Sequence, residues 1–163
     1  MDRDALPPAS IKAGQEFDDA LQKLGFRADG LFWAWDRTIE QFVLVLVTEH
    51  FDYAGPHAVS GVLLDAYRAA ATPAEISPFI VRVHSPRQAI IRNMMVVDAH
   101  DQTGKRVENI NAAGEIADLQ YVNHWVYRWP PTDMIKATKK KREPTARSRE
   151  WRKIVSAVDR LAA

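Results

Sequence analysis

Six consecutive apolar residues, 42–47, constrain the fold of this chain more than any other feature. The run is rich in β-branched side chains and contains no polar residue that would mark a solvent-facing side, which is typical of a strand buried on both faces. The segment before it alternates instead, so that Leu31, Trp33 and Trp35 share one face of a strand. We therefore expect a β-hairpin, joined by a tight connection at residues 36–38.

Two helices are predicted from apolar residues that recur at helical spacing. The first begins at Ala13 and is ended by Gly25, since glycine accepts the left-handed backbone found after a helix. The second covers residues 56–71 and begins at a proline. Residues 49–55 are expected to form a loop, and residues 72–75 have the sequence of a capping box that starts a short turn.

The second half of the chain is predicted to consist mainly of strands, expected over residues 79–85, 90–100, 106–111 and 118–129. Helices grouped against such strands indicate an α+β class. We predict a mostly antiparallel sheet of about five to six strands, with two main helices packed on it and a C-terminal amphipathic helix. A length of 163 residues suits one domain, with an N-terminal arm (1–12), an α+β core (13–131) and a basic C-terminal extension (132–163).

The charge of the chain is divided unevenly. Residues 1–131 carry 12 basic and 17 acidic side chains, a net charge of −5, whereas residues 132–163 carry 10 basic and 4 acidic ones, a net charge of +6. Such an asymmetry bears on partners. The basic extension is expected to be a solvated linker, a contact for nucleic-acid phosphates, or a contact for a membrane surface or an acidic protein. An acidic body could also hold it without any outside partner. The residues proposed for such a contact are Lys139, Lys140, Lys141, Arg142, Arg147, Arg149, Arg152 and Lys153.

The end of the extension has the pattern of an amphipathic helix. Its apolar stripe comprises Trp151, Ile154, Val155, Val158 and Leu161. A free helix of this kind would be marginal in water, so the stripe is expected to dock on its own core, on a second subunit or on a partner.

Aromatic residues are concentrated on the predicted strands. Residues 121, 125 and 127 share one face of the last strand, and two tryptophans share one face of the first. These rings either belong to the core or line a stacking groove suited to single-stranded nucleic acid or a flat ligand. The groove would comprise Trp33, Trp35, Tyr121, Trp125 and Tyr127.

Sequence signatures of catalysis are weak. The absence of cysteine excludes thiol catalysis, Cys-ligated zinc, Fe–S clusters and disulfides, and no phosphate-binding glycine motif or zinc-protease motif occurs. Asp98 and His100 would share one face of a strand, as metal ligands or an acid–base pair would. A second polar group, Glu49, His50, Asp52 and His57, precedes the helix over residues 56–71.

The leading hypothesis is a cytoplasmic, non-enzymatic binding module without a cofactor. It is expected to form a homo-oligomer and to contact nucleic acid or an acidic protein through its basic extension. A cytoplasmic location is expected because the N-terminus lacks the basic start and apolar run of a secretory signal. The longest apolar run is also too short to span a membrane. There are two alternatives to this leading hypothesis. One is a metal-dependent hydrolase or nuclease that uses Asp98 and His100. The other is a module that forms homo-oligomers or binds other proteins through its C-terminal helix.

Overall fold

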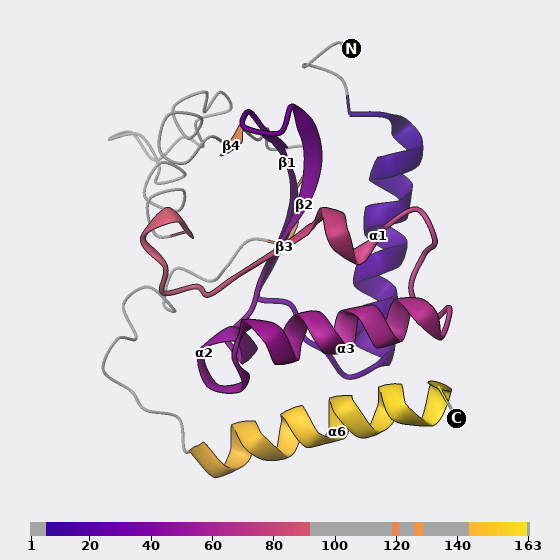
Figure 1. The fold of residues 1–163 in the computed structure, drawn as a ribbon, viewed down its shortest axis with the longest axis vertical. Helices are drawn as coiled ribbons and strands as arrows, with labels where there is room; N and C mark the ends of the chain where they lie inside the picture. Colours follow the sequence, from indigo (N-terminus) through magenta and orange to yellow (C-terminus); the bar gives the residue numbers. More distant parts are fainter. Residues whose placement is uncertain (1–5, 92–118, 121–125, 129–143, 163) are drawn as a thin grey trace, which may run out of the picture.

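The computed structural model describes residues 6–91, 119–120, 126–128 and 144–162. They form an α+β fold in which helices cover one face of a sheet (Figure 1). The elements follow in the order α1 (Pro8–Lys23), β1 (Gly30–Asp36), β2 (Gln41–Val47), α2 (His50–Ala54), α3 (Pro56–Arg68), η1 (Pro78–Ile80), β3 (Val81–His84), β4 (Leu119–Gln120), β5 (Val126–Arg128) and α6 (Pro144–Ala162).

The predicted hairpin is confirmed. β1 and β2 pair antiparallel along their whole length, with Trp33 opposite Leu44. The connection is held by Asp36, whose Oδ1 accepts a hydrogen bond of 2.9 Å from the backbone N–H of Thr38. All residues from 43 to 47 are buried, so β2 is covered on both faces as its apolar run predicts.

The sheet is mixed rather than mostly antiparallel. β3 pairs parallel with β2, whereas β2, β4 and β5 all pair antiparallel with β1. α2 and α3 lie between β2 and β3 in the chain, and such a helical crossover returns the chain to the starting end of the sheet and makes the strands parallel. In the described residues the sheet is four strands wide, in the order β3-β2-β1-β4. β5 adds no width, because it pairs with β1 on the same edge as β4. The sheet is therefore narrower than the five to six strands predicted.

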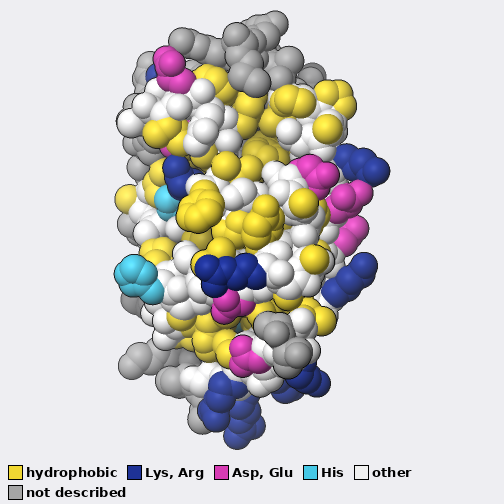
Figure 2. Space-filling view, turned by 45° about the vertical axis from the view of Figure 1, so that its right-hand side comes forward, with side chains coloured by type: hydrophobic (Ala, Val, Ile, Leu, Met, Phe, Trp, Pro, Cys, Tyr) yellow, Lys and Arg dark blue, Asp and Glu magenta, His cyan; other side chains and the backbone are white. Residues whose placement is uncertain are grey.

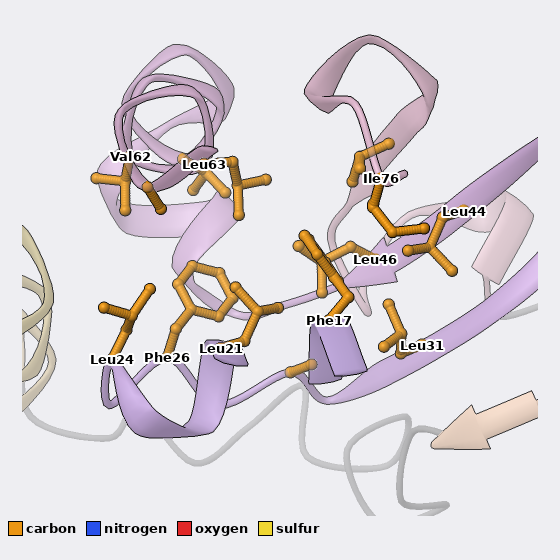
Figure 3. Packing of buried hydrophobic residues seen from close by; sticks show 14 of the residues in the cluster. Phe17, Leu21, Leu24, Phe26, Leu31, Leu44, Leu46, Val62, Leu63 and Ile76 are labelled. Carbon is orange, nitrogen blue, oxygen red and sulfur yellow. The ribbon is translucent and has the colours of Figure 1, made fainter. Parts of the chain in front are cut away.

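The helices occupy one side of this sheet, and a second apolar cluster occupies the other. Side chains from α1 and α3 meet those of β1 and β2 in the larger core, and Figure 3 shows Phe17, Leu21 and Leu63 from the helices together with Leu31 and Leu46 from the strands. The opposite face carries Phe32, Ala34, Val43, Val45 and Val47, packed with Ile91 and Leu119. The two main helices predicted to pack on the sheet are therefore α1 and α3.

Several boundaries differ from the predictions. α1 begins at Pro8 and so takes in part of the predicted arm, because a proline at the first helical position has a favourable φ and lacks only an N–H that would be unpaired there. Its last residue is Lys23, and Gly25 follows with a φ of 77°, the left-handed backbone predicted after this helix. Residues 50–54, predicted as loop, form the short helix α2.

The segment after α3 also departs from the prediction. Thr72 does not act as a cap, since its buried Oγ1 has no hydrogen-bond partner among the described residues. The strand predicted over 79–85 is shorter, because Pro78 to Ile80 form η1 before β3 begins. Residues 90 and 91 are helical, and the remainder of the strand predicted over 90–100, like the strand over 106–111, lies outside the described residues.

Candidate functional site

α6 docks on the body of its own chain. It lies beside α3 and α2 and forms the outer layer at the lower end of the molecule (Figure 1). Ile154 and Val158 are 1% and 2% exposed and belong to the larger core, and Trp151 and Val155 pack against it. Apart from Leu161, which is 52% exposed, the predicted apolar stripe is thus covered by the protein itself, and this is the first of the three arrangements expected for it.

The opposite side of α6 carries a row of cations. At 100° per residue, these side chains fall on the face turned away from Ile154, and all of them are exposed: Arg149, Arg152, Lys153 and Arg160. We call these four residues the basic face. Figure 2 shows Lys and Arg side chains gathered at the lower end of the molecule, where α6 lies in Figure 1.

The contacts that the basic face makes within α6 do not neutralise its positive charges. The Nε atoms of Arg152 and Arg160 donate to backbone carbonyls one turn earlier in α6, Ser148 O at 3.2 Å and Ser156 O at 3.0 Å. Within the part of the chain that the structure describes, no carboxylate lies within 4.0 Å of the four cations. The face can therefore accept an anionic partner without first breaking an ion pair with these residues.

Arg147 differs from the other predicted contact residues on α6 because it points toward the body. Its side chain is 14% exposed, with Nη2 3.7 Å from Oε2 of Glu49. Its guanidinium carbon lies 5.9 Å above the centre of the Tyr53 ring, a cation–π distance. Its Nε is buried without a hydrogen-bond partner among the described residues. Arg147 is thus part of the docking contact rather than of the basic face.

A buried histidine lies beneath the first half of α6. The ring of His50 is hydrogen-bonded through Nδ1 to the hydroxyl of Tyr53. It meets the ring of Phe26 edge-on at 5.0 Å and the ring of Trp151 at 5.4 Å. We call the following residues the His50 cluster: Phe26, Glu49, His50, Tyr53, Arg147 and Trp151.

Burial governs the protonation of the His50 cluster. It lowers the pKa of His50, although the nearby carboxylates of Glu150 and Glu49 act in the opposite direction. Burial, followed by the charge of Glu150, raises the pKa of Tyr53 to about 12. At neutral pH the cluster therefore contains a neutral imidazole next to a protonated phenol.

The structure places the first two members of the predicted stacking groove in the interior of the protein. Trp33 and Trp35 are 2% and 5% exposed, because their face of β1 is the one that the helices cover. Tyr127 is half-buried, with its hydroxyl donating to the carbonyl of Ile11 at 2.6 Å and accepting from Nε1 of Trp33 at 3.0 Å. Those three rings hold elements together, and the other two members, Tyr121 and Trp125, lie outside the described residues.

Other predicted site residues also fall outside the described ranges. The basic run Lys139, Lys140, Lys141 and Arg142 precedes α6 there, and Asp98 and His100 lie in the undescribed segment 92–118. The metal-dependent hydrolase thus stays a prediction. In the described ranges no group of three or more His, Asp or Glu side chains is arranged to hold a metal ion.

A further polar cluster, only partly indicated by the sequence, lies at the carboxyl ends of the parallel strands β2 and β3. Ser85 Oγ donates to Oδ1 of Asp52 at 2.7 Å and accepts from the backbone N–H of Arg87 at 3.0 Å. His84 and Gln88 are hydrogen-bonded at 2.8 Å. Ser85 is buried and its hydroxyl is fully engaged, so this cluster fastens β3 to α2 and does not present a nucleophile.

None of the described helices has the length and apolar character needed to cross a membrane. Comparison of the chain with models of known protein families, with curated proteins and with solved structures found no match.

Proposed function

We propose that the protein binds nucleic acid through the basic face of α6, with the phosphate backbone as the feature recognised. One observation carries this proposal: α6 buries its apolar stripe against its own body and turns four cations outward together. A docked helix holds these cations in a fixed row, which a free helix of this length and charge would not do.

The spacing of the basic face suits a polyanion. From Arg149 to Arg160 the helix rises about 17 Å, so the four charges extend along a line that several consecutive phosphates can follow. Each phosphate that is neutralised releases condensed counterions, and this release favours binding irrespective of base sequence. We therefore expect little sequence specificity, since phosphate contacts position a protein without reading bases.

The charge of the rest of the chain directs the same partner toward α6. Residues 1–131 carry a net charge of −5 and repel a polyanion, whereas the extension attracts it. The basic run over residues 139–142 immediately precedes α6 in sequence and would add to the contact.

Fluorescence anisotropy of labelled oligonucleotides at 50 and 200 mM salt tests this proposal. We expect tighter binding at the lower salt, by on the order of 100-fold for four phosphate contacts. The variant Arg149→Gln/Arg152→Gln/Lys153→Gln/Arg160→Gln should lose most of the affinity and most of the dependence on salt.

A matched control removes four exposed cations from the body. Lys12→Gln/Lys23→Gln/Arg27→Gln/Arg68→Gln changes the net charge by the same amount, and all four residues are exposed. It should bind almost as the wild type does. Equal losses in the two variants would show that net charge alone acts and would overturn the basic face as the binding surface. Binding of polyglutamate but of no oligonucleotide would overturn nucleic acid as the partner.

A further inference from the structure

The half of α6 that comes first in the chain is held on the body by the His50 cluster rather than by aliphatic packing alone. Trp151 covers the His50 ring, while Arg147 reaches Glu49 and the ring of Tyr53. The second half of the helix is held by Ile154 and Val158 in the core. His50 contacts Trp151, and two residues of the basic face, Arg149 and Arg152, lie on either side of Trp151 in sequence. A change in the charge of His50 therefore affects the end of α6 at which the basic face begins.

The charged groups around His50 come from three parts of the chain. α6 contributes Arg147 and Glu150, Glu49 directly precedes α2, and Asp29 lies just before β1, while the neutral phenol of Tyr53 comes from α2 itself. Asp29 fixes this arrangement by accepting a hydrogen bond of 2.7 Å from the backbone N–H of Glu49. Of these carboxylates, Glu49 is balanced in part by Arg147, with which it pairs at 3.7 Å.

We infer that protonation of His50 releases the first half of α6 from the body and thereby disrupts the basic face. The second part of this inference depends on the proposed function, whereas the release of α6 does not. A protonated ring would place a buried cation next to the rings of Phe26 and Trp151, in a cluster that already holds the guanidinium of Arg147. Burying that charge costs free energy that the undocked state avoids.

The direction of the pH dependence follows from the burial of His50. Its pKa in the docked protein lies below the ordinary value of 6.5, mainly because of burial. The stabilisation of the docked state is therefore complete above pH 6.5 and is lost as the pH falls below it.

Release of α6 has a consequence opposite to the usual effect of acid. Added positive charge normally strengthens binding to a polyanion. Here the released helix is marginal by itself, and Arg147 and Arg149 in its first turns oppose the helix dipole. We expect the row of cations to lose its order, so that nucleic-acid affinity falls between pH 7.5 and pH 5.5.

Hydrogen–deuterium exchange of the full chain without nucleic acid tests the release of α6. After correction for the intrinsic pH dependence of exchange, protection of amides in residues 148–162 should fall between pH 7.5 and pH 5.5, by up to about tenfold, which is the limit for uptake of one proton by a group with an ordinary pKa of 6.5. Protection in α1 should change much less. Protection of α6 that is the same at both pH values in the wild type overturns the inference, whatever any variant does.

Variants at two histidines, His50 and His57, show which residue causes the pH-dependent release of α6. His50→Phe retains an aromatic ring between Phe26 and Trp151 but cannot be protonated, so α6 should stay protected at pH 5.5; His50→Gln serves the same purpose if the first variant does not fold. His57→Gln removes an exposed histidine at the start of α3 and should respond to pH as the wild type does. A loss of protection in His50→Phe equal to that of the wild type would overturn the assignment to His50.

Oligonucleotide binding at the two pH values separates the two claims. Weaker binding at pH 5.5 in the wild type, but not in His50→Phe, supports the full inference. Absence of binding at both pH values, with pH-dependent protection of α6, would overturn the proposed function and leave the release of α6 standing. Equal binding at both pH values despite that loss of protection would overturn the link between docking and the basic face.

Discussion

The guanidinium of Arg128 on β5 and the carboxylate of Asp18 on α1 form an ion pair, with Nε 2.7 Å from Oδ1 and 2.9 Å from Oδ2. The side chain of Asp18 is only 5% exposed, and its Oδ2 also accepts a hydrogen bond of 3.0 Å from Gln22. This pair ties a strand near the end of the body to the first helix.

Replacing Arg128 should therefore destabilise the fold. Arg128→Ala leaves the Asp18 carboxylate buried without its cation, and we expect a loss of about 2 kcal/mol in the free energy of unfolding, measured by urea denaturation. Arg68→Ala removes an exposed partner of Asp65, 3.7 Å away on the same helix, and should cost no more than about 0.5 kcal/mol. Equal losses would contradict a special role for the buried pair.

A second prediction concerns the close contact of α1 with Tyr127. A Cβ at Gly14 would lie 2.6 Å from Cε2 and Cζ of that ring, and two hydrogen bonds of the hydroxyl restrict its movement. Gly14→Ala should cost about 1–3 kcal/mol. Gly61→Ala, also within a helix but with nothing within 4 Å, should be neutral or stabilising by up to about 1 kcal/mol. Thermal unfolding of both variants checks this difference, and similar melting temperatures would contradict it.

A third prediction tests how α6 is held. Ile154→Ala removes a side chain that is 1% exposed, and a buried deletion of this size costs about 2–5 kcal/mol. Leu161 lies on the same helix but is 52% exposed, so Leu161→Ala should change stability by no more than about 0.5 kcal/mol. If urea denaturation gave the same result for both, α6 would not be docked as described.

The parts of the fold that followed from sequence are those fixed by local pattern. The apolar run over 42–47 implied a strand buried on both faces, and the spacing of Val59, Val62 and Ala66 implied α3, since both patterns depend on neighbours in the chain. The direction of β3 could not be obtained in this way, because residues alternate between the faces of a strand whichever way it runs. The pairing of β4 and β5 with β1 could likewise not be predicted, because it joins residues that are far apart in the sequence.

In the candidate site, too, the features set by local spacing could be predicted and those set by long-range contacts could not. The apolar stripe of α6 was readable from its helical spacing, but Arg147 was grouped with the outward cations. Its position four residues before Trp151 and seven before Ile154 places it on the inner stripe, so the spacing alone could have separated it. The acidic partner that makes this inner position tolerable, Glu49, is far away in sequence and could not be inferred.

A fourth prediction concerns the stability of the body at acid pH. Burial lowers the pKa of His84, against the effect of its hydrogen bond with Gln88, and Arg82 lowers it further. Since the folded-state pKa lies below the ordinary value of 6.5, the unfolded chain binds the proton first and stability falls as the pH drops below 6.5. His84→Gln should reduce the difference between unfolding free energies at pH 7.5 and pH 5.5. An unchanged difference would show that His84 does not contribute.

The pairing of β1 with β4 and β5 has a consequence for biosynthesis. β2 follows β1 directly, but the strands that the described residues place on the opposite edge of β1 begin at Leu119 and Val126. Until the ribosome has produced those residues, the backbone of a strand containing Leu31, Phe32, Trp33 and Trp35 has one unpaired edge, and such an edge can pair with other chains. We therefore expect the nascent chain to be prone to aggregation while β1 and β2 have emerged from the ribosome and β4 and β5 have not.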